Sequence, residues 1–262
     1  MVERRRRGKG QRKLLAGHQQ SWLWGRHLVL ETLRQGNWGI DQLWIADDLP
    51  PGDLSSLTPL LNQLGLAPQV APRARLTELA KTAEHQGLLA RMGPFPYAEP
   101  ATLLATVPLP TLWLLIDGVQ DPFNLGSLLR SAGALGVAAV VLAGQGQVGV
   151  NSLVARASAG VIHRLPIARA DDLAGLAREL TTRGVQVVGA VARADLDLRD
   201  CDLTRPTAFV VGNESRGLSP AVQQACQKLA GIPLHAEVDS LNVAAAGAVL
   251  FYEAHRQRTR PG

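Results

Sequence analysis

Three polar stretches of this sequence carry side chains suited to chemistry, and each follows an apolar run. In order along the chain, the candidate residues are Asn124 and Arg130, then Glu214, then Ser240 and Asn242. Amides, a carboxylate, a hydroxyl and a guanidinium can together hold and polarise a polar substrate. Any one of them could be only a helix-start or turn residue. Three such loops in one region predict a ligand site.

The apolar runs are the elements that must position these side chains. From Thr111 onward, near-continuous hydrophobic strands alternate with helical patterns, which predicts a mostly parallel sheet with helices on both faces. Ligands bind such sheets beyond the carboxyl ends of the strands, where the polar loops fall. Gly212 and Gly217 are expected to let the backbone approach a ligand. Ser240 is expected to cap the last helix, and the small residues 244–248 allow close packing of another segment.

A smaller α/β unit is predicted over residues 21–97, with a helix ending at Gly36 and strands at IDQLWIADDL and near HQGLLARMGPF. Prolines concentrate between the two units, and we place a linker at 98–110 and the main domain at 111–262. GIPLH, immediately before the third polar loop, is expected to be a short strand.

The basic charge is concentrated in residues 1–20, which hold seven Lys or Arg and one Glu, while the rest of the chain is close to neutral. Such a tail is typical of non-specific phosphate binding, with a solubilising tail as the alternative. Cys201 and Cys226 have no metal-ligand or disulfide spacing, which favours reduced thiols in the cytoplasm. No apolar run reaches the roughly 18 residues of a membrane span. A cytoplasmic protein without membrane or metal is therefore expected.

GQGQVG, residues 144–149, has the outline of a dinucleotide-binding fingerprint. That fingerprint needs a helix that opens on its last glycine. Here Val150 and Asn151 intervene, and Asn151 or Ser152 is a plausible N-cap. We interpret the stretch as a mobile glycine loop, with a nucleotide-dependent oxidoreductase as the alternative.

In their order and spacing, the three polar stretches resemble the three motifs of the SpoU-type (TrmH-like) RNA ribose 2′-O-methyltransferases of the SPOUT superfamily. DGVQDPFNLGSLLRSAGALG resembles the first, the G-x-E-x-x-G of VVGNESRGLS the second, and the Ser-Leu-Asn of residues 240–242 the third. Phe123 stands where many members have histidine. The N-terminal unit resembles the family's L30e-like substrate-binding domain. The resemblance is strongest to enzymes that 2′-O-methylate a guanosine of large-subunit (23S) rRNA.

The resemblance implies a homodimer with a deep C-terminal trefoil knot that binds S-adenosylmethionine and acts on RNA, rRNA being favoured. The cofactor would lie against Gly212, Ile232 and Leu241. Arg130 would help to remove the ribose 2′-hydroxyl proton, either as a base assisted by an RNA phosphate or only as a positioning cation, because arginine stays protonated in proteins. The residues expected to orient it and the ribose are Asn124, Glu214, Ser240 and Asn242. Two alternatives are a tRNA ribose methyltransferase and a non-catalytic RNA-binding or ribosome-assembly factor.

Overall fold

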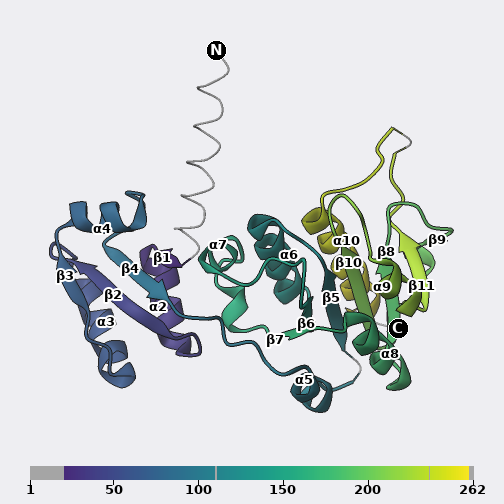
Figure 1. Cartoon of the computed structure of the whole chain (residues 1–262), viewed down its shortest axis with the longest axis horizontal. Helices are drawn as coiled ribbons and strands as arrows, with labels where there is room; N and C mark the ends of the chain where they lie inside the picture. Colours follow the sequence, from purple (N-terminus) through teal and green to yellow (C-terminus); the bar gives the residue numbers. More distant parts are fainter. Residues whose placement is uncertain (1–20, 110, 236, 260–262) are drawn as a thin grey trace. The chain divides into compact units, whose positions relative to one another are not determined.

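The computed structural model of the protein describes residues 21–109, 111–235 and 237–259, so the predicted basic tail lies outside the described residues. The described chain forms two compact units (Figure 1). One contains residues 21–96 and 150–163, and the other contains residues 97–149 and 164–259. Within these ranges, no helix has the length and apolar character needed to cross a membrane.

The first unit is built on a four-stranded sheet with the strand order β1-β4-β2-β3. Its elements are β1 (Trp22–Trp24), α2 (Arg26–Gln35), β2 (Ile40–Ala46), α3 (Pro51–Leu64), β3 (Gln69–Ala71), α4 (Arg73–Ala80), β4 (Leu88–Met92), α7 (Ser152–Ala157) and η1 (Val161–His163). β4 pairs antiparallel with β1 and β2, whereas β3 pairs parallel with β2. As predicted, α2 ends at Gly36, whose N–H donates to the Thr32 carbonyl at 3.0 Å.

A segment far along the chain completes this first unit. The guanidinium of Arg156, in α7, lies 3.8 Å from the centre of the Trp24 ring in β1. The Nε2 atom of His163 lies 2.9 Å from the hydroxyl oxygen of Thr32 in α2. Both contacts involve buried or half-buried side chains, so residues 150–163 belong to the packed body of the unit.

The second unit holds a seven-stranded sheet in the order β7-β6-β5-β10-β8-β11-β9, in which every pairing is parallel. Its elements are α5 (Pro100–Thr106), β5 (Leu112–Asp117), α6 (Pro122–Ala134), β6 (Val137–Ala143), β7 (Ile167–Ala170), α8 (Leu173–Thr182), β8 (Gln186–Ala190), β9 (Leu196–Asp197), η2 (Leu198–Asp200), β10 (Thr207–Gly212), α9 (Pro220–Ala225), β11 (Lys228–Gly231) and α10 (Val243–Thr259).

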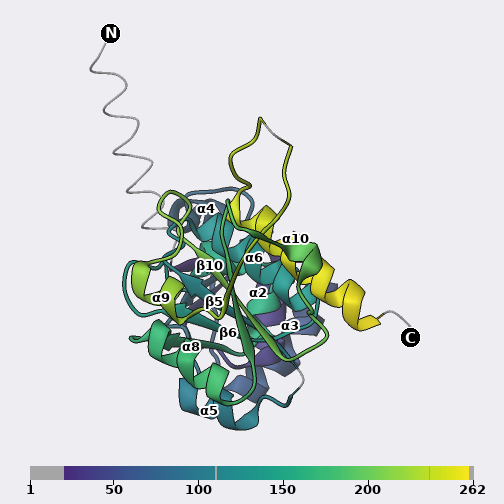
Figure 2. The same ribbon diagram turned by 90° about the vertical axis from the view of Figure 1, so that its right-hand side faces the viewer.

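Two layers of helices cover this sheet, with α5, α8 and α9 on one face and α6 and α10 on the other (Figure 2). Successive strand residues point to opposite faces: Val210 joins the core shared with α5, α8 and α9, whereas Phe209 meets Phe251 of α10, their ring centres 6.3 Å apart. Gly247 lets α10 lie close to α6, because a Cβ atom there would overlap the side chain of Leu128. The α/β architecture and the close packing of the small-residue run are as predicted; the knot remains a prediction.

The structure corrects the expected strand at GIPLH. The strand is β11, at Lys228–Gly231, and residues 232–235 have no regular structure. α9 ends at Ala225, Cys226 is already extended, and the chain then pairs with β8. Pro233 could donate no hydrogen bond to a continued ladder. The proline-rich segment also contains a helix, α5, which begins at Pro100, a favoured first helical residue.

Candidate active site

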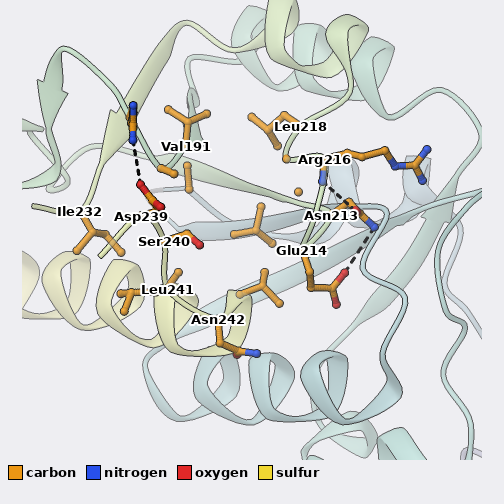
Figure 3. Close-up of a pocket in the computed structure, with 18 of the residues that line it drawn as sticks. Val191, Asn213, Glu214, Arg216, Leu218, Ile232, Asp239, Ser240, Leu241 and Asn242 are labelled. Carbon is orange, nitrogen blue, oxygen red and sulfur yellow. Dashed lines mark hydrogen bonds and ion pairs between the residues drawn. The ribbon is translucent and has the colours of Figure 1, made fainter. Parts of the chain in front are cut away.

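A cavity of about 750 Å³ opens beyond the carboxyl ends of β8, β10 and β11. β8 pairs with both other strands, so the three ends are adjacent. Val191, Leu218 and Ile232 contribute apolar walls, while the polar groups come from loop 213–217 and from residues 239–242, which lead into α10 (Figure 3). This is the position at which parallel α/β sheets bind ligands.

The three residues predicted to contact a cofactor all line the cavity: Gly212, Ile232 and Leu241. The physical reason for Gly212 differs from our expectation, however. A Cβ atom at this position would overlap the backbone of Gly217. Glycine is therefore required because the two sides of the loop approach each other, and not only because a ligand approaches the backbone.

Loop 213–217 has a shape fixed by its own backbone and by one side chain. The N–H of Asn213 donates to the Gly217 carbonyl and the Gly217 N–H donates back, both at 2.9 Å. The Oδ1 atom of Asn213 accepts the N–H groups of Ser215 and Arg216 at 3.0 and 3.1 Å. Its Nδ2 atom donates to the Gly118 carbonyl at 2.8 Å, which attaches the loop to the end of β5. The sequence did not single out Asn213, because Asn in a turn has many roles.

Glu214, Asn124 and Asn242 form a chain of side-chain hydrogen bonds. The Nδ2 atom of Asn124 donates to Oε1 of Glu214 at 3.0 Å, and Nδ2 of Asn242 donates to Oδ1 of Asn124 at 2.9 Å. The structure thus brings together one residue from each of the three predicted motifs, although Asn124 and Asn242 are 118 residues apart.

Glu214 is held as an ionised acceptor. Burial alone would raise the pKa of its carboxyl group, but hydrogen bonds from Asn124 and from the backbone N–H groups of Glu214, Gln120 and Asp121 outweigh burial. The net pKa therefore lies below the ordinary glutamate value of 4.5. A carboxylate with several N–H donors is a rigid support for the amide beside it.

Ser240 lines the cavity but does not cap α10, contrary to our expectation. Asn242 immediately precedes the first helical residue, and its Oδ1 atom accepts the Ala244 N–H at 2.9 Å. Asn242 therefore both caps the helix and contributes to the side-chain chain.

Arg130 stands apart from the other predicted residues. It lies on α6 six residues after Asn124, so at 3.6 residues per turn the two side chains point in directions roughly 120° apart. The Arg130 side chain is exposed, does not line the cavity, and makes no hydrogen bond or ion pair with the described part of the chain. Within one copy of the chain, the site therefore lacks its predicted guanidinium.

Two charged groups at the cavity were not predicted. The Nη2 atom of Arg193, after β8, lies 2.9 Å from Oδ1 of Asp239, and both side chains are about nine-tenths exposed (87% and 90%), so the pair adds little stability. Arg216 also lines the cavity, but Figure 3 shows its guanidinium pointing away from the other labelled residues. Their place after strand ends is the only signal that the sequence offers for either.

The glycine loop 144–149 does not have the geometry of a dinucleotide fingerprint. α7 begins at Ser152, and the Asn151 side chain caps it by accepting the N–H groups of Leu153 and Val154 at 2.9 and 3.1 Å. Residues 144–149 do not line the cavity. Nothing in this loop favours the oxidoreductase alternative.

The cavity suits S-adenosylmethionine in size and lining. Its volume lies within the roughly 300–1,000 Å³ of typical cofactor sites. Apolar side chains such as Ile232 and Leu241 can cover a base, and the backbone at three strand ends offers donors and acceptors. Leu241 is exposed, as expected of an apolar residue that a ligand would cover.

Comparison with known proteins agrees with this geometry. Residues 111–252 match the SpoU rRNA methylase family, and residues 22–98 match the RNA 2′-O ribose methyltransferase substrate-binding family. The chain is 34% identical over 247 residues to YacO of Bacillus subtilis, named as a TrmH family tRNA/rRNA methyltransferase, covering 93% of this chain and 98% of that protein. It is 35% identical over 245 residues to the 23S rRNA (guanosine-2′-O-)-methyltransferase RlmB of Shewanella oneidensis, covering 91% and 98%.

Solved structures give the same result. The SpoU methyltransferase AviRb from Streptomyces viridochromogenes, in complex with AdoMet, superposes with a TM-score of 0.75 at 26% identity and covers 90% of both chains. An AdoMet-bound rRNA methyltransferase from Sinorhizobium meliloti gives 0.76 at 25% identity and covers 94% of this chain and 90% of that one.

A parallel α/β unit with a cofactor-sized cavity at its strand ends, joined to an RNA substrate-binding unit, defines an RNA methyltransferase. The chain belongs to the SpoU family. It is therefore an RNA 2′-O-ribose methyltransferase that uses S-adenosylmethionine, and the predicted family, enzyme class and cofactor are confirmed.

Proposed function

We propose that this protein methylates the ribose 2′-oxygen of a guanosine in 23S rRNA, in the cytoplasm. One observation carries the choice of rRNA: relatives named for that reaction match across both units, over 91% of this chain. A structural neighbour described as a tRNA-modifying TrmH/SpoU enzyme of A. aeolicus covers only 57% of it. Target choice follows the substrate-binding unit, and the rRNA enzymes resemble this chain across both units.

When bound, S-adenosylmethionine supplies a methyl group activated by its sulfonium. Gly212, Ile232 and Leu241 hold the cofactor through backbone groups and apolar contacts. The Glu214–Asn124–Asn242 chain prevents both amides from rotating, because each amide uses a donor and an acceptor. Each Nδ2 atom retains a second hydrogen that can bind the ribose. Holding the 2′-oxygen in line with the methyl group lowers the barrier by up to several kcal/mol.

Arg130 completes the site of a second copy of the chain. Seven residues separate it from Phe123, so the two side chains lie on the same face of α6, and Phe123 is 58% exposed. On the neighbouring α10, Val249 and Tyr252 are also exposed. Exposed apolar side chains on one helix pair favour an interface, and pairing through this face makes a homodimer. There, Arg130 orients the substrate phosphate, while the hydroxyl proton leaves to that phosphate or to water.

Arg130→Ala should keep its affinity for S-adenosylmethionine, measured by calorimetry, and lose methylation of 23S rRNA. Arg205→Ala, which removes an exposed guanidinium from the same unit, is the control. Mixing Arg130→Ala chains with Gly212→Val chains should restore activity that neither has alone, because one site per mixed dimer is then intact. No restoration would place Arg130 and the cavity of one chain in the same site.

The target is tested by mapping 2′-O-methyl groups in total RNA from cells with and without the gene. We expect loss of one guanosine methylation in 23S rRNA. Loss in tRNA would overturn the proposed target, and cofactor binding with no lost methyl group would favour a non-catalytic RNA-binding factor.

A further inference from the structure

The glycine loop 144–149, which the proposed function does not use, is joined to the active-site loop by hydrogen bonds through one residue, Gly118. The Gly118 N–H donates to Oε1 of Gln147 at 3.0 Å. Its carbonyl accepts from Nδ2 of Asn213 at 2.8 Å. One glycine directly after β5 thus connects the two loops.

The backbone of Gly118 makes this double connection possible. Its φ of +90° is a conformation that residues with a side chain rarely adopt. A Cβ atom there would lie 3.7 Å from both Asn213 Cβ and the Gly146 carbonyl oxygen, so both loops are in contact with this position. The next residue, Val119, accepts the Val148 N–H at 2.9 Å, which keeps the glycine loop beside the chain after β5.

Gln147 is itself fixed at both ends of its amide. Its Nε2 atom donates to the Val148 carbonyl at 3.2 Å while Oε1 holds Gly118. The side chain is half-buried. By contrast, Gln145 in the same loop is exposed and has no hydrogen bond within the described ranges. The loop therefore provides both a connected glutamine and an unconnected one.

The other end of the active-site loop is attached to the same place. The Oδ2 atom of Asp117 accepts the Ser219 N–H at 2.6 Å. Residues 117 and 118 therefore hold the loop that carries Gly212, Glu214 and Gly217 at both its start and its end. Movement of Gly118 would move one of these two attachments.

We propose that Gln147 is a positioning residue of the methyltransferase site. It fixes Gly118, Gly118 fixes Asn213, and Asn213 fixes the loop that lines the cofactor cavity and carries Glu214. The effect on methylation rests on the proposed function, but the effect on cofactor binding does not depend on the RNA target.

The experiment compares Gln147→Ala, Gln147→Glu and the control Gln145→Ala in the full-length chain. A neutral hydrogen bond contributes about 0.5–1.5 kcal/mol, so Gln147→Ala should raise the Kd for S-adenosylmethionine about three- to tenfold in calorimetry. Gln147→Glu keeps an acceptor for the Gly118 N–H and should stay within about threefold of wild type. Gln145→Ala should not change the Kd.

A double-mutant cycle with Asn213→Ala separates positioning from general destabilisation. If both residues act through Gly118, Gln147→Ala should change the Kd less than about twofold when Asn213 is already alanine. Multiplying effects, or equal Kd values for Gln147→Ala and Gln145→Ala, would overturn the proposal. Wild-type protein that binds the cofactor but methylates no RNA would refute the proposed function and leave this inference intact.

Discussion

Replacing Asn124 by aspartate should slow methyl transfer more than replacing it by alanine, although aspartate is closer to asparagine in shape. Nδ2 of Asn124 donates to Oε1 of Glu214 at 3.0 Å, so the substitution places an oxygen where the donor was and two carboxylates face each other. The acceptor of the bond from Asn242 is kept. The change therefore isolates the contact with Glu214.

The size of the effect follows from Coulomb's law and from exposure. Two unit charges about 4 Å apart repel by about 1 kcal/mol in water and about 4 kcal/mol at an effective dielectric constant of 20. Glu214 is exposed, which places the penalty toward the lower end, at about 1–2 kcal/mol. At about 1.4 kcal/mol per factor of ten, Asn124→Asp should react about five- to thirtyfold more slowly than Asn124→Ala.

The pH dependence gives a second signature. In the wild type, hydrogen bonds hold the pKa of Glu214 below its ordinary value, so it is ionised throughout the assay range. A facing carboxylate would raise the pKa of Glu214 in the variant. As the pH falls from about 8 to about 5, one of the two carboxyl groups should take up a proton and donate to the other. Asn124→Asp should therefore regain activity relative to wild type on acidification.

The assay is single-turnover methylation of 23S rRNA at saturating cofactor across this pH range. Asn62→Asp, on the exposed side of α3, makes the same change of charge where the structure shows no hydrogen bond to the side chain among the described residues, and it should behave as wild type. If Asn124→Asp and Asn124→Ala react at equal rates at every pH, the carboxylate of Glu214 does not orient Asn124 in the reacting complex.

Three further substitutions test packing and charge. Gly212→Ala should lower the free energy of unfolding by about 1–3 kcal/mol in urea and weaken cofactor binding, because the new methyl group overlaps the opposite side of its loop; Gly52→Ala, with no atom within 4 Å, is the matched control and should not destabilise. Gly247→Ala should cost a similar amount by forcing α10 away from α6, and a loss under about 0.5 kcal/mol would show that the helices adjust freely. Because the folded-state pKa of Glu214 is lowered, its stabilising contribution is present above pH 4.5 and is lost as the pH falls through the folded value; Glu214→Gln should flatten the stability–pH curve there, and an unchanged curve would contradict the hydrogen bonds to the carboxylate.

The sequence predicts the fold well where a pattern is long enough to show a period. The buried run at Thr207–Gly212 and the small-residue helix at Val243–Thr259 are examples. β1 and β9 have three and two residues, too few for any alternation to appear. β11 was predicted several residues too late, because GIPLH has the composition of a strand while the pairing partner β8 determines where the strand forms.

The site follows the same division. Parallel strands place their carboxyl ends at one edge, which is why Asn124, Glu214 and Asn242 could be predicted to meet. The attachment of Asn213 to Gly118 depends on a side-chain contact across 95 residues, and no local pattern encodes it. For Arg130 the helical rotation was visible in the sequence: six residues turn a side chain away from its starting face.

The position of residues 150–163 in the first unit has a consequence for how this protein can be altered or can evolve. The polypeptide passes between the two units three times, after residues 96, 149 and 163. A fragment cut at the proline-rich segment would lose α7, together with the Arg156 and His163 contacts that help close its core. The RNA-recognising half therefore cannot be exchanged as a cassette: recombination that brings in a new one must also bring the fourteen residues embedded in the catalytic half of the gene.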